Sequence, residues 1–159
     1  MAGTIWKPHV TVAAVVERDG RFLLVEELID GRLILNQPAG HLDEDESLFA
    51  AVVREAREET AWEFEPEALI GLYLWKEPTG QKSFLRAAFA GRCLRHHPEQ
   101  ALDVGVQRAL WLSREEMAAE SSRLRSPLVL LCVDDFLRGR RYPLELLRHL
   151  DGAGVAPQP

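Results

Sequence analysis

The sequence predicts a domain of the α/β or α+β class, because segments typical of strands and of helices interleave along the chain. Asp-Gly turns separate short apolar runs, the first of which is rich in Val and Thr, and this is typical of β-hairpins. A 14-residue segment, 47–60, contains neither Gly nor Pro and consists mainly of good helix formers. The length of 159 residues and the hydrophobic content of 47% suit one core. We therefore expect one domain over residues 1–150, followed by a disordered Gly- and Pro-rich tail at 151–159.

The first part of the chain predicts two hairpin turns in succession. Asp19-Gly20 and Asp30-Gly31 each stand between apolar runs. In order, we expect a strand at 9–17, a turn at 18–20, a strand at 21–25, a turn at 29–31, a strand at 32–35 and a loop at 36–40.

The later part predicts one long helix and two shorter ones. Ser47–Thr60 is the first of them, and strands follow at 69–75, 83–90 and 109–112. Ser113 and Glu116 have the spacing of a capping box, which opens a helix. Pro127 suits the first position of a final helix that runs to about Leu137 and ends at Gly139.

Charge and composition exclude several classes of function. The 19 Lys and Arg against 25 Asp and Glu give a net charge of −6, which argues against broad neutralisation of a nucleic acid backbone. The longest apolar run, Leu128–Val133, is too short to cross a membrane, and Met1–Trp6 does not resemble a secretory signal. Cys93 and Cys132 lack metal-site spacing, so we expect buried, reduced thiols and a cytoplasmic location.

The expected helix at 47–60 has an apolar stripe that becomes acidic. Glu55 and Glu59 continue the stripe formed by Leu48, Ala51 and Val52, and Glu58 lies beside them. Like charges at these spacings repel, and the helix dipole disfavours them further. Two interpretations follow: the glutamates are solvated and balanced by neighbouring arginines, or they bind a hard cation such as Mg²⁺ or Mn²⁺.

The residues around this stripe match a longer pattern. Gly40, Glu46 and the run Arg54-Glu55-Ala56-Arg57-Glu58-Glu59 resemble the Nudix box, G-x5-E-x7-R-E-U-x-E-E-x-G-U, in which U is a bulky apolar residue. The chain departs from the pattern at Ala61, where the family has Gly. We therefore expect either a different helix exit or about 1 kcal/mol of strain at Ala61.

The resemblance extends over most of the chain and points to the NudJ-type group of bacterial Nudix phosphatases. The stretches that carry it are 7–13, 36–42, 84–86, 124–129 and 141–145. The resemblance implies a Nudix-type α/β/α sandwich, in which a mixed sheet lies between helices.

The resemblance also implies a metal centre. Its ligands would be Glu55, Glu58, Glu59 and the carbonyl of Ala39, with Glu46 in support. Glu55 would be the general base, with Glu58 as the alternative, and Arg54 would hold one carboxylate in place. Mg²⁺, for which Mn²⁺ can substitute, would neutralise the phosphates and polarise the attacking water.

Residues outside the box predict where the substrate binds. Arg86 is a candidate phosphate ligand, and Trp75 is a candidate for stacking on a base. His9 and His41 flank the predicted site. Each of these four also has a purely structural interpretation.

Two further positions are open to more than one interpretation. Many Nudix proteins have an additional acid ahead of a Trp that here is Trp111, and Asp103 or Gln107 could take that role. Arg123 and Arg125 precede a helix N-terminus, which favours either an anion site or a structural role.

The leading hypothesis is a Mg²⁺-dependent phosphohydrolase that cleaves nucleoside di- and triphosphates. The NudJ-type resemblance adds release of orthophosphate and action on the hydroxymethylpyrimidine pyrophosphate precursor of thiamine. One alternative is a pyrophosphohydrolase for ADP-ribose, dinucleoside polyphosphates or oxidised dGTP, and another is a non-catalytic nucleotide sensor. The expected partner is a small diphosphate, with no nucleic acid polymer and no membrane, and the expected state is a monomer or small homo-oligomer.

Overall fold

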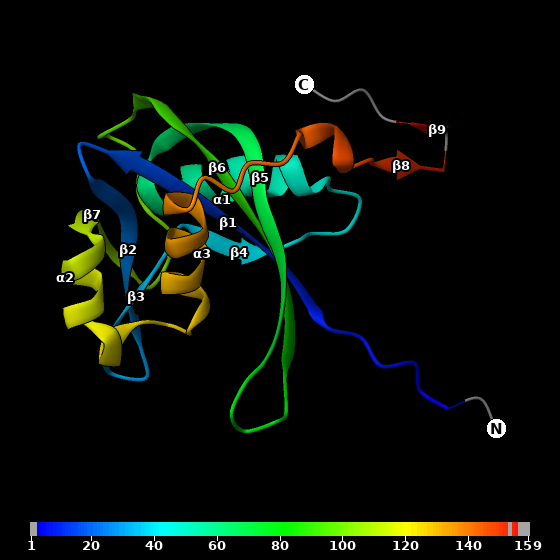
Figure 1. Ribbon diagram of the computed structural model, residues 1–159, viewed down its shortest axis with the longest axis horizontal. Coiled ribbons are helices and arrows are strands. Elements are labelled where there is room, and N and C mark those ends of the chain that lie inside the picture. Colours follow the sequence, from blue (N-terminus) through cyan, green and yellow to red (C-terminus); the bar gives the residue numbers. More distant parts are fainter. Residues whose placement is uncertain (1–2, 153, 156–159) are drawn as a thin grey trace.

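A seven-stranded mixed sheet forms the centre of the protein in the computed structural model, which describes residues 3–152 and 154–155 (Figure 1). The strands run in the order β3-β2-β1-β6-β5, with β4 paired to β1 and β7 paired to β2. β1 and β6 are parallel, and the other pairs are antiparallel. Their bounds are β1 His9–Arg18, β2 Arg21–Ile29, β3 Arg32–Asn36, β4 Ala39–His41, β5 Trp62–Lys76, β6 Ser83–His96 and β7 Val106–Ser113.

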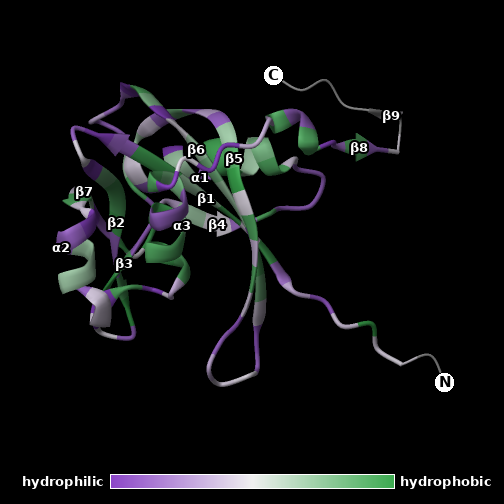
Figure 2. Ribbon diagram, viewed as in Figure 1, coloured by the Kyte–Doolittle hydropathy of each residue, from purple (hydrophilic) through white to green (hydrophobic). Residues whose placement is uncertain are grey.

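Helices cover both faces of this sheet. α1 (Leu48–Thr60) packs on one face, where Val52 joins a core that contains Val12 and Phe89. α2 (Arg114–Ala119) and α3 (Leu128–Leu137) cover the other face, in a core that contains Met117 and Val133. In Figure 2 much of β2 is green, whereas the loop between β4 and α1 is mostly purple. The arrangement confirms the predicted α/β/α sandwich.

Both predicted Asp-Gly turns are present. Asp19 and Gly20 have φ angles of 53° and 76°, and Asp30 and Gly31 have 49° and 75°. Two consecutive residues with positive φ form the turn whose twist suits a two-residue hairpin. These turns fix the register of β2 against β1 and β3.

Several predicted boundaries differ from the observed ones. The predicted loop at 36–40 contains the start of β4, a strand of three residues that pairing with β1 stabilises. β5 and β6 are about twice as long as predicted, and the additional residues of β5, 62–68, contain two register shifts that interrupt its alternation. The hairpin that these two strands form projects from the body (Figure 1). The final helix begins at Leu128, with Pro127 as its N-cap.

Other local predictions have mixed outcomes. The capping box of Ser113 and Glu116 is present. Ala61 ends α1 in the left-handed region, with φ 58° and ψ 15°, so a different helix exit is wrong and the strained exit is the one observed. Cys132 is buried and Cys93 half-buried, and both are free thiols.

The chain after α3 contains short elements. The 3₁₀ turns η1 (Ser121–Arg123) and η2 (Leu144–Leu146) flank α3, and β8 (Leu150–Asp151) pairs with β9 (Gly154–Val155). The rest of the predicted tail, 153 and 156–159, lies outside the described residues. None of the helices in the described ranges has the length and hydropathy that crossing a bilayer requires.

Candidate active site

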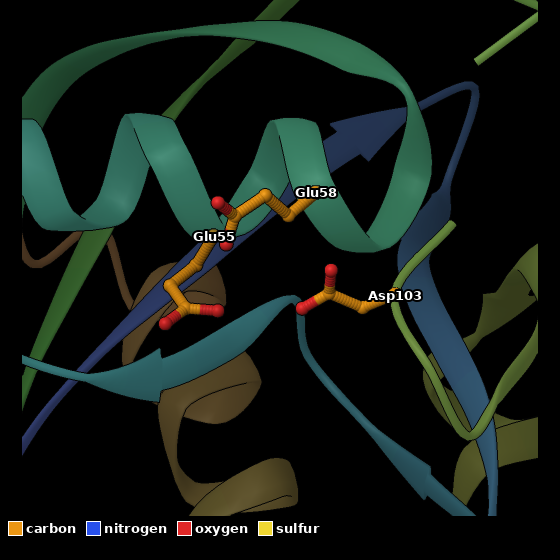
Figure 3. Close-up of side chains that lie close together, drawn as sticks. All are labelled: Glu55, Glu58 and Asp103. Carbon is orange, nitrogen blue, oxygen red and sulfur yellow. The ribbon is translucent and has the colours of Figure 1, made fainter. Parts of the chain in front are cut away.

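Three carboxylates from α1 and the loop before β7 meet beside β4. Glu55, Glu58 and Asp103 each place an oxygen within 4.8 Å of the others, as Figure 3 shows. The backbone N–H of Asp103 donates to the carbonyl of Glu58 at 3.0 Å, which fixes the loop against α1. Since Mg²⁺ and Mn²⁺ prefer carboxylate oxygens, this cluster suits a hard divalent cation.

Gly40 allows β4 to approach this cluster. A Cβ atom at Gly40 would lie 2.1 Å from Oε1 of Glu55, far inside van der Waals contact. Any larger residue would therefore displace the carboxylate or the strand. This close approach explains why the first position of the Nudix box is a glycine.

Arg54 lies at the centre of the ion pairs that hold the glutamates. Its Nε and Nη2 donate to the two oxygens of Glu46 at 2.8 and 2.9 Å, and its Nη1 donates to Glu55 at 2.8 Å and to Glu58 at 3.1 Å. Nη2 also donates to the carbonyl of His41 at 3.0 Å, which ties α1 to β4. One guanidinium thus positions three carboxylates and partly offsets their repulsion.

Burial acts against ionisation of the two deeper glutamates. It raises the pKa of Glu55 above its usual value, although Arg54 opposes the shift, and it raises the pKa of Glu59 to about 9. Glu59 accepts a hydrogen bond from the backbone N–H of Ala39 at 2.8 Å. By contrast, the hydrogen bonds from Arg54 lower the pKa of Glu46. A bound cation would compensate the buried charge that Arg54 leaves unbalanced.

A pocket of about 550 Å³ adjoins the cluster across β4. Ala39, Gly40 and His41 line it, so the same short strand contacts the carboxylates and the pocket. Arg86 and Trp75 also line this pocket. Its volume suits a small-molecule ligand.

Aromatic rings form a row in which Trp75, Phe84 and His41 line this pocket and His9 lies behind its lining. Trp75 stacks on Phe84 with ring centroids 5.7 Å apart, and Phe84 stacks on His9 at 5.3 Å. His9 meets His41 edge to face at 5.4 Å. Burial lowers the pKa of His41, and the nearby charge of His9 lowers it further. The rings predicted to contact the substrate are therefore neighbours.

Three comparisons with known proteins give one consistent result. A model of the NUDIX domain matches residues 7–130. The chain belongs to the Nudix family. It is 43% identical to phosphatase NudJ of Escherichia coli K12 over 143 residues, which is 90% of this chain and 92% of the relative. The structure of a Nudix hydrolase from Nitrosomonas europaea matches with a TM-score of 0.89 and 46% identity, covering 92% of this chain and 99% of that one.

Family membership makes the chain a hydrolase of phosphoanhydride bonds, related to a phosphatase. Nudix hydrolases generally use divalent metal ions and bind nucleotide-like diphosphates, which suits the acidic cluster and the adjoining pocket. A MutT protein from Methanosarcina mazei, at 22% identity and a TM-score of 0.68, shares the Nudix fold.

The four glutamates of the Nudix box do not all lie in the carboxylate cluster. Glu55 and Glu58 lie in the cluster, Glu59 lies beside Ala39, and Glu46 is bound to Arg54. Asp103, one of two positions considered for an additional acid, joins the cluster, whereas the Gln107 side chain donates to the carbonyl of Gly105.

The arginines before α3 have separate surroundings. Arg123 pairs with Glu26 and Glu120, which fits a structural role, whereas Arg125 lines the pocket. Two further pocket residues, Thr11 and Asn36, were missed by sequence reasoning. Thr11 is an ordinary strand residue in the sequence and Asn36 an ordinary turn former, so neither residue type indicated a site.

Proposed function

We propose that this protein is a Mg²⁺-dependent phosphohydrolase that cleaves nucleoside di- and triphosphates and releases orthophosphate. The observation that carries the proposal is the cluster of Glu55, Glu58 and Asp103 beside a pocket of about 550 Å³. The similarity to phosphatase NudJ over nearly the whole chain supports orthophosphate as the product. The hydroxymethylpyrimidine pyrophosphate precursor of thiamine is included among the proposed substrates because it combines a diphosphate with a small ring.

The donor set fits Mg²⁺, with Mn²⁺ as a substitute. The proposed ligands are Glu55, Glu58, Glu59 and the carbonyl of Ala39, with Glu46 in support, and the position of Asp103 adds it to the set. When bound, the cation neutralises the phosphate oxygens and lowers the pKa of the attacking water.

The protein groups provide orientation and a base. Glu55 is the proposed general base and Glu58 the alternative, and Arg54 holds both carboxylates at hydrogen-bond distance. On the pocket side, Arg86, Trp75, His9 and His41 are the proposed substrate contacts. A fixed orientation makes a general base more effective, and the hydrogen bonds from Arg54 support this role.

The identity of the released phosphate tests the proposed reaction. Turnover of GTP with Mg²⁺ should yield orthophosphate and GDP, and GDP should then yield orthophosphate and GMP. Chromatographic separation of the nucleotides with a phosphate assay measures both products. If pyrophosphate and GMP form directly from GTP, the proposed site of cleavage is wrong.

The variant Glu59→Gln tests the metal assignment. The amide retains an oxygen that can accept from Ala39 N–H, so the fold should remain intact by circular dichroism. Loss of the carboxylate should abolish Mg²⁺-dependent turnover. Glu99→Gln is the matched control, because Glu99 is exposed and is not one of the clustered carboxylates. Undiminished hydrolysis by Glu59→Gln would contradict the assignment.

A further inference from the structure

The pocket contains three buried polar atoms without hydrogen-bond partners in the described part of the chain. They are Oγ1 of Thr11, Oδ1 of Asn36 and Nε of Arg86, from residues that are 7%, 7% and 6% exposed. Buried polar atoms are nearly always paired, because an unpaired one costs about 1–3 kcal/mol. All three residues line the same pocket, so the unpaired atoms are concentrated at one place.

The fold fixes the backbone positions of these three residues. Thr11 on β1 and Arg86 on β6 are direct partners in the parallel pair of strands. Arg86 Nη1 donates to Oε1 of Gln37 at 3.3 Å, and Gln37 in turn donates to the carbonyl of Val129 at 2.6 Å. Asn36 precedes Gln37 and is the last residue of β3. Strand pairing therefore fixes where these residues stand along the pocket, and Gln37 holds the guanidinium of Arg86.

Their chemistry specifies what a ligand must present. The Nε of arginine can only donate, so it requires an acceptor such as a ring carbonyl or ring nitrogen. The Oδ1 of Asn36 accepts and requires an N–H group, and the hydroxyl of Thr11 can do either. Donors and acceptors side by side on one edge are a property of nucleobases and aminopyrimidines.

The aromatic side chains and the position of the pocket favour the same ligand. Trp75 and Phe84 line the pocket as a stacked pair, which offers an apolar surface to a planar ring. Gly40 lines the pocket while its backbone lies against the carboxylate of Glu55. A diphosphate held at the carboxylates would therefore have its attached group next to the unpaired atoms.

We propose that Thr11, Asn36 and Arg86 bind the polar edge of a planar heterocycle, a nucleobase or aminopyrimidine ring, and so select the substrate. The inference rests on the proposed function, since the ring must be joined to the diphosphate that is cleaved. The three residues determine specificity and lie apart from the carboxylate cluster.

Thr11→Val and Asn36→Ala test this inference. Against GTP and CTP, each variant should lose at least 10-fold in kcat/KM, mainly through KM, because the ring loses a hydrogen bond. Hydrolysis of inorganic tripolyphosphate, which has no ring, should not change. Gln81→Ala is the matched control, because Gln81 is an exposed amide outside the pocket.

The melting temperature separates ligand binding from a structural role. Thr11 Oγ1 makes no hydrogen bond within the described residues, so Thr11→Val, which changes the side-chain shape little, should leave the melting temperature equal or higher. Asn36→Ala also leaves a cavity, so its melting temperature should fall slightly. Asn36→Leu keeps the number and branching of the side-chain heavy atoms, with larger methyl groups, and serves as a second variant. Equal losses on tripolyphosphate and nucleotides, together with a lower melting temperature, would assign the residues to folding and overturn the inference.

A binding measurement distinguishes this inference from the proposed function. A GTP analogue with a methylene bridge in place of the cleaved anhydride is titrated calorimetrically into wild type and variants with Mg²⁺. Binding at least 10-fold weaker in Thr11→Val supports the inference, even if wild type hydrolyses no nucleotide and the proposed function fails. Equal binding by all variants overturns the inference, even if hydrolysis is confirmed.

Discussion

The carboxylate cluster and the adjoining pocket share β4, yet their buried polar groups differ in one respect. In the cluster, Arg54 donates to Glu46, Glu55 and Glu58. In the pocket, Thr11 and Asn36 each have a buried oxygen without a partner among the described residues. The cluster is thus organised before a ligand binds, whereas the pocket leaves hydrogen-bonding capacity for the ligand. Both arrangements lower the cost of rearranging the protein when a ligand binds. The cluster does so because its carboxylates are already positioned. The pocket does so because its oxygens need not break other hydrogen bonds.

The first prediction removes the group that organises the cluster. Arg54→Gln should lower kcat by about 10²-fold, because three carboxylates lose the donor that positions them and a shift of about 1 Å has an effect of this size. Steady-state kinetics with GTP and Mg²⁺ measure the change. Arg92→Gln is the control, since Arg92 forms ion pairs with Glu65 and Glu67 and its side chain is 64% exposed. Unchanged kcat in Arg54→Gln would show that the cluster does not depend on this guanidinium.

The second prediction concerns the contribution of Asp103 to cation binding. A cation that binds only the folded state, at a free concentration about 100 times its Kd, raises the free energy of unfolding by about 2.7 kcal/mol. For a chain of this size, the melting temperature then rises by roughly 5–10 °C. Asp103→Asn should reduce this Mg²⁺-dependent rise by half or more, as one of three clustered carboxylates loses its charge. Differential scanning fluorimetry with and without Mg²⁺ measures it.

A control is needed for the loop that carries Asp103. The hydrogen bond from its backbone N–H to Glu58 does not involve the side chain, so the metal-free melting temperature should change little. Glu99→Gln should show the full rise with Mg²⁺. If Mg²⁺ raised the melting temperature of Asp103→Asn as much as that of wild type, Asp103 would not be a ligand of the cation.

The third prediction uses a buried carboxylate that is paired entirely within the protein. Glu26, whose side chain is 6% exposed, accepts from Arg108 at 2.9 Å and also pairs with Arg123. The hydrogen bond from Arg108 is the main cause that lowers the pKa of Glu26 below 4.5. Because the folded pKa is lowered, the stabilisation is complete above about pH 4.5 and is lost as the pH falls through the folded value.

Glu26→Gln should therefore lower the unfolding free energy by about 1–2 kcal/mol at pH 7. The difference in unfolding free energy between Glu26→Gln and wild type should shrink below pH 4.5, where the wild-type carboxyl also becomes neutral. Urea unfolding at several pH values measures this. A difference that stays constant down to pH 3 would show that the ion pairs contribute nothing beyond packing.

The parts of the molecule that were predictable from sequence depend on nearby residues. The helix at 47–60 and the turn at Asp19-Gly20 follow from local preferences, and both are observed. The sequence predicts only residues 69–75 of β5, because register shifts between Trp62 and Phe64 and between Pro66 and Ala68 hide the period of its first half. β4 was missed because three residues form a strand only when β1 is beside them.

The same reasoning explains which site residues the sequence indicated. Glu55 and Glu58 lie on one helix at a spacing that brings their side chains to one side, so a pattern along the chain identifies them. Thr11 and Asn36 come from separate strands, and only the sheet pairing brings them to one pocket. Residue type gave no signal there, because what distinguishes these atoms is the absence of a partner in the folded structure.

The last and smallest effect tests whether the end of α1 influences the cluster. Ala61 has φ 58°, a conformation that costs a non-glycine residue about 1–2 kcal/mol. Ala61→Gly removes this strain and loses one buried methyl group, worth roughly 0.8 kcal/mol, so the melting temperature should rise by about 1–2 °C. Gly139→Ala is the matched opposite change, since Gly139 follows α3 with φ 78°, and it should lower the melting temperature.

Turnover by Ala61→Gly should equal that of wild type, because Arg54 and Gly40, and not the helix end, hold Glu55 in place. A change in kcat without a change in stability would instead show that the strained exit positions Glu59, two residues before Ala61.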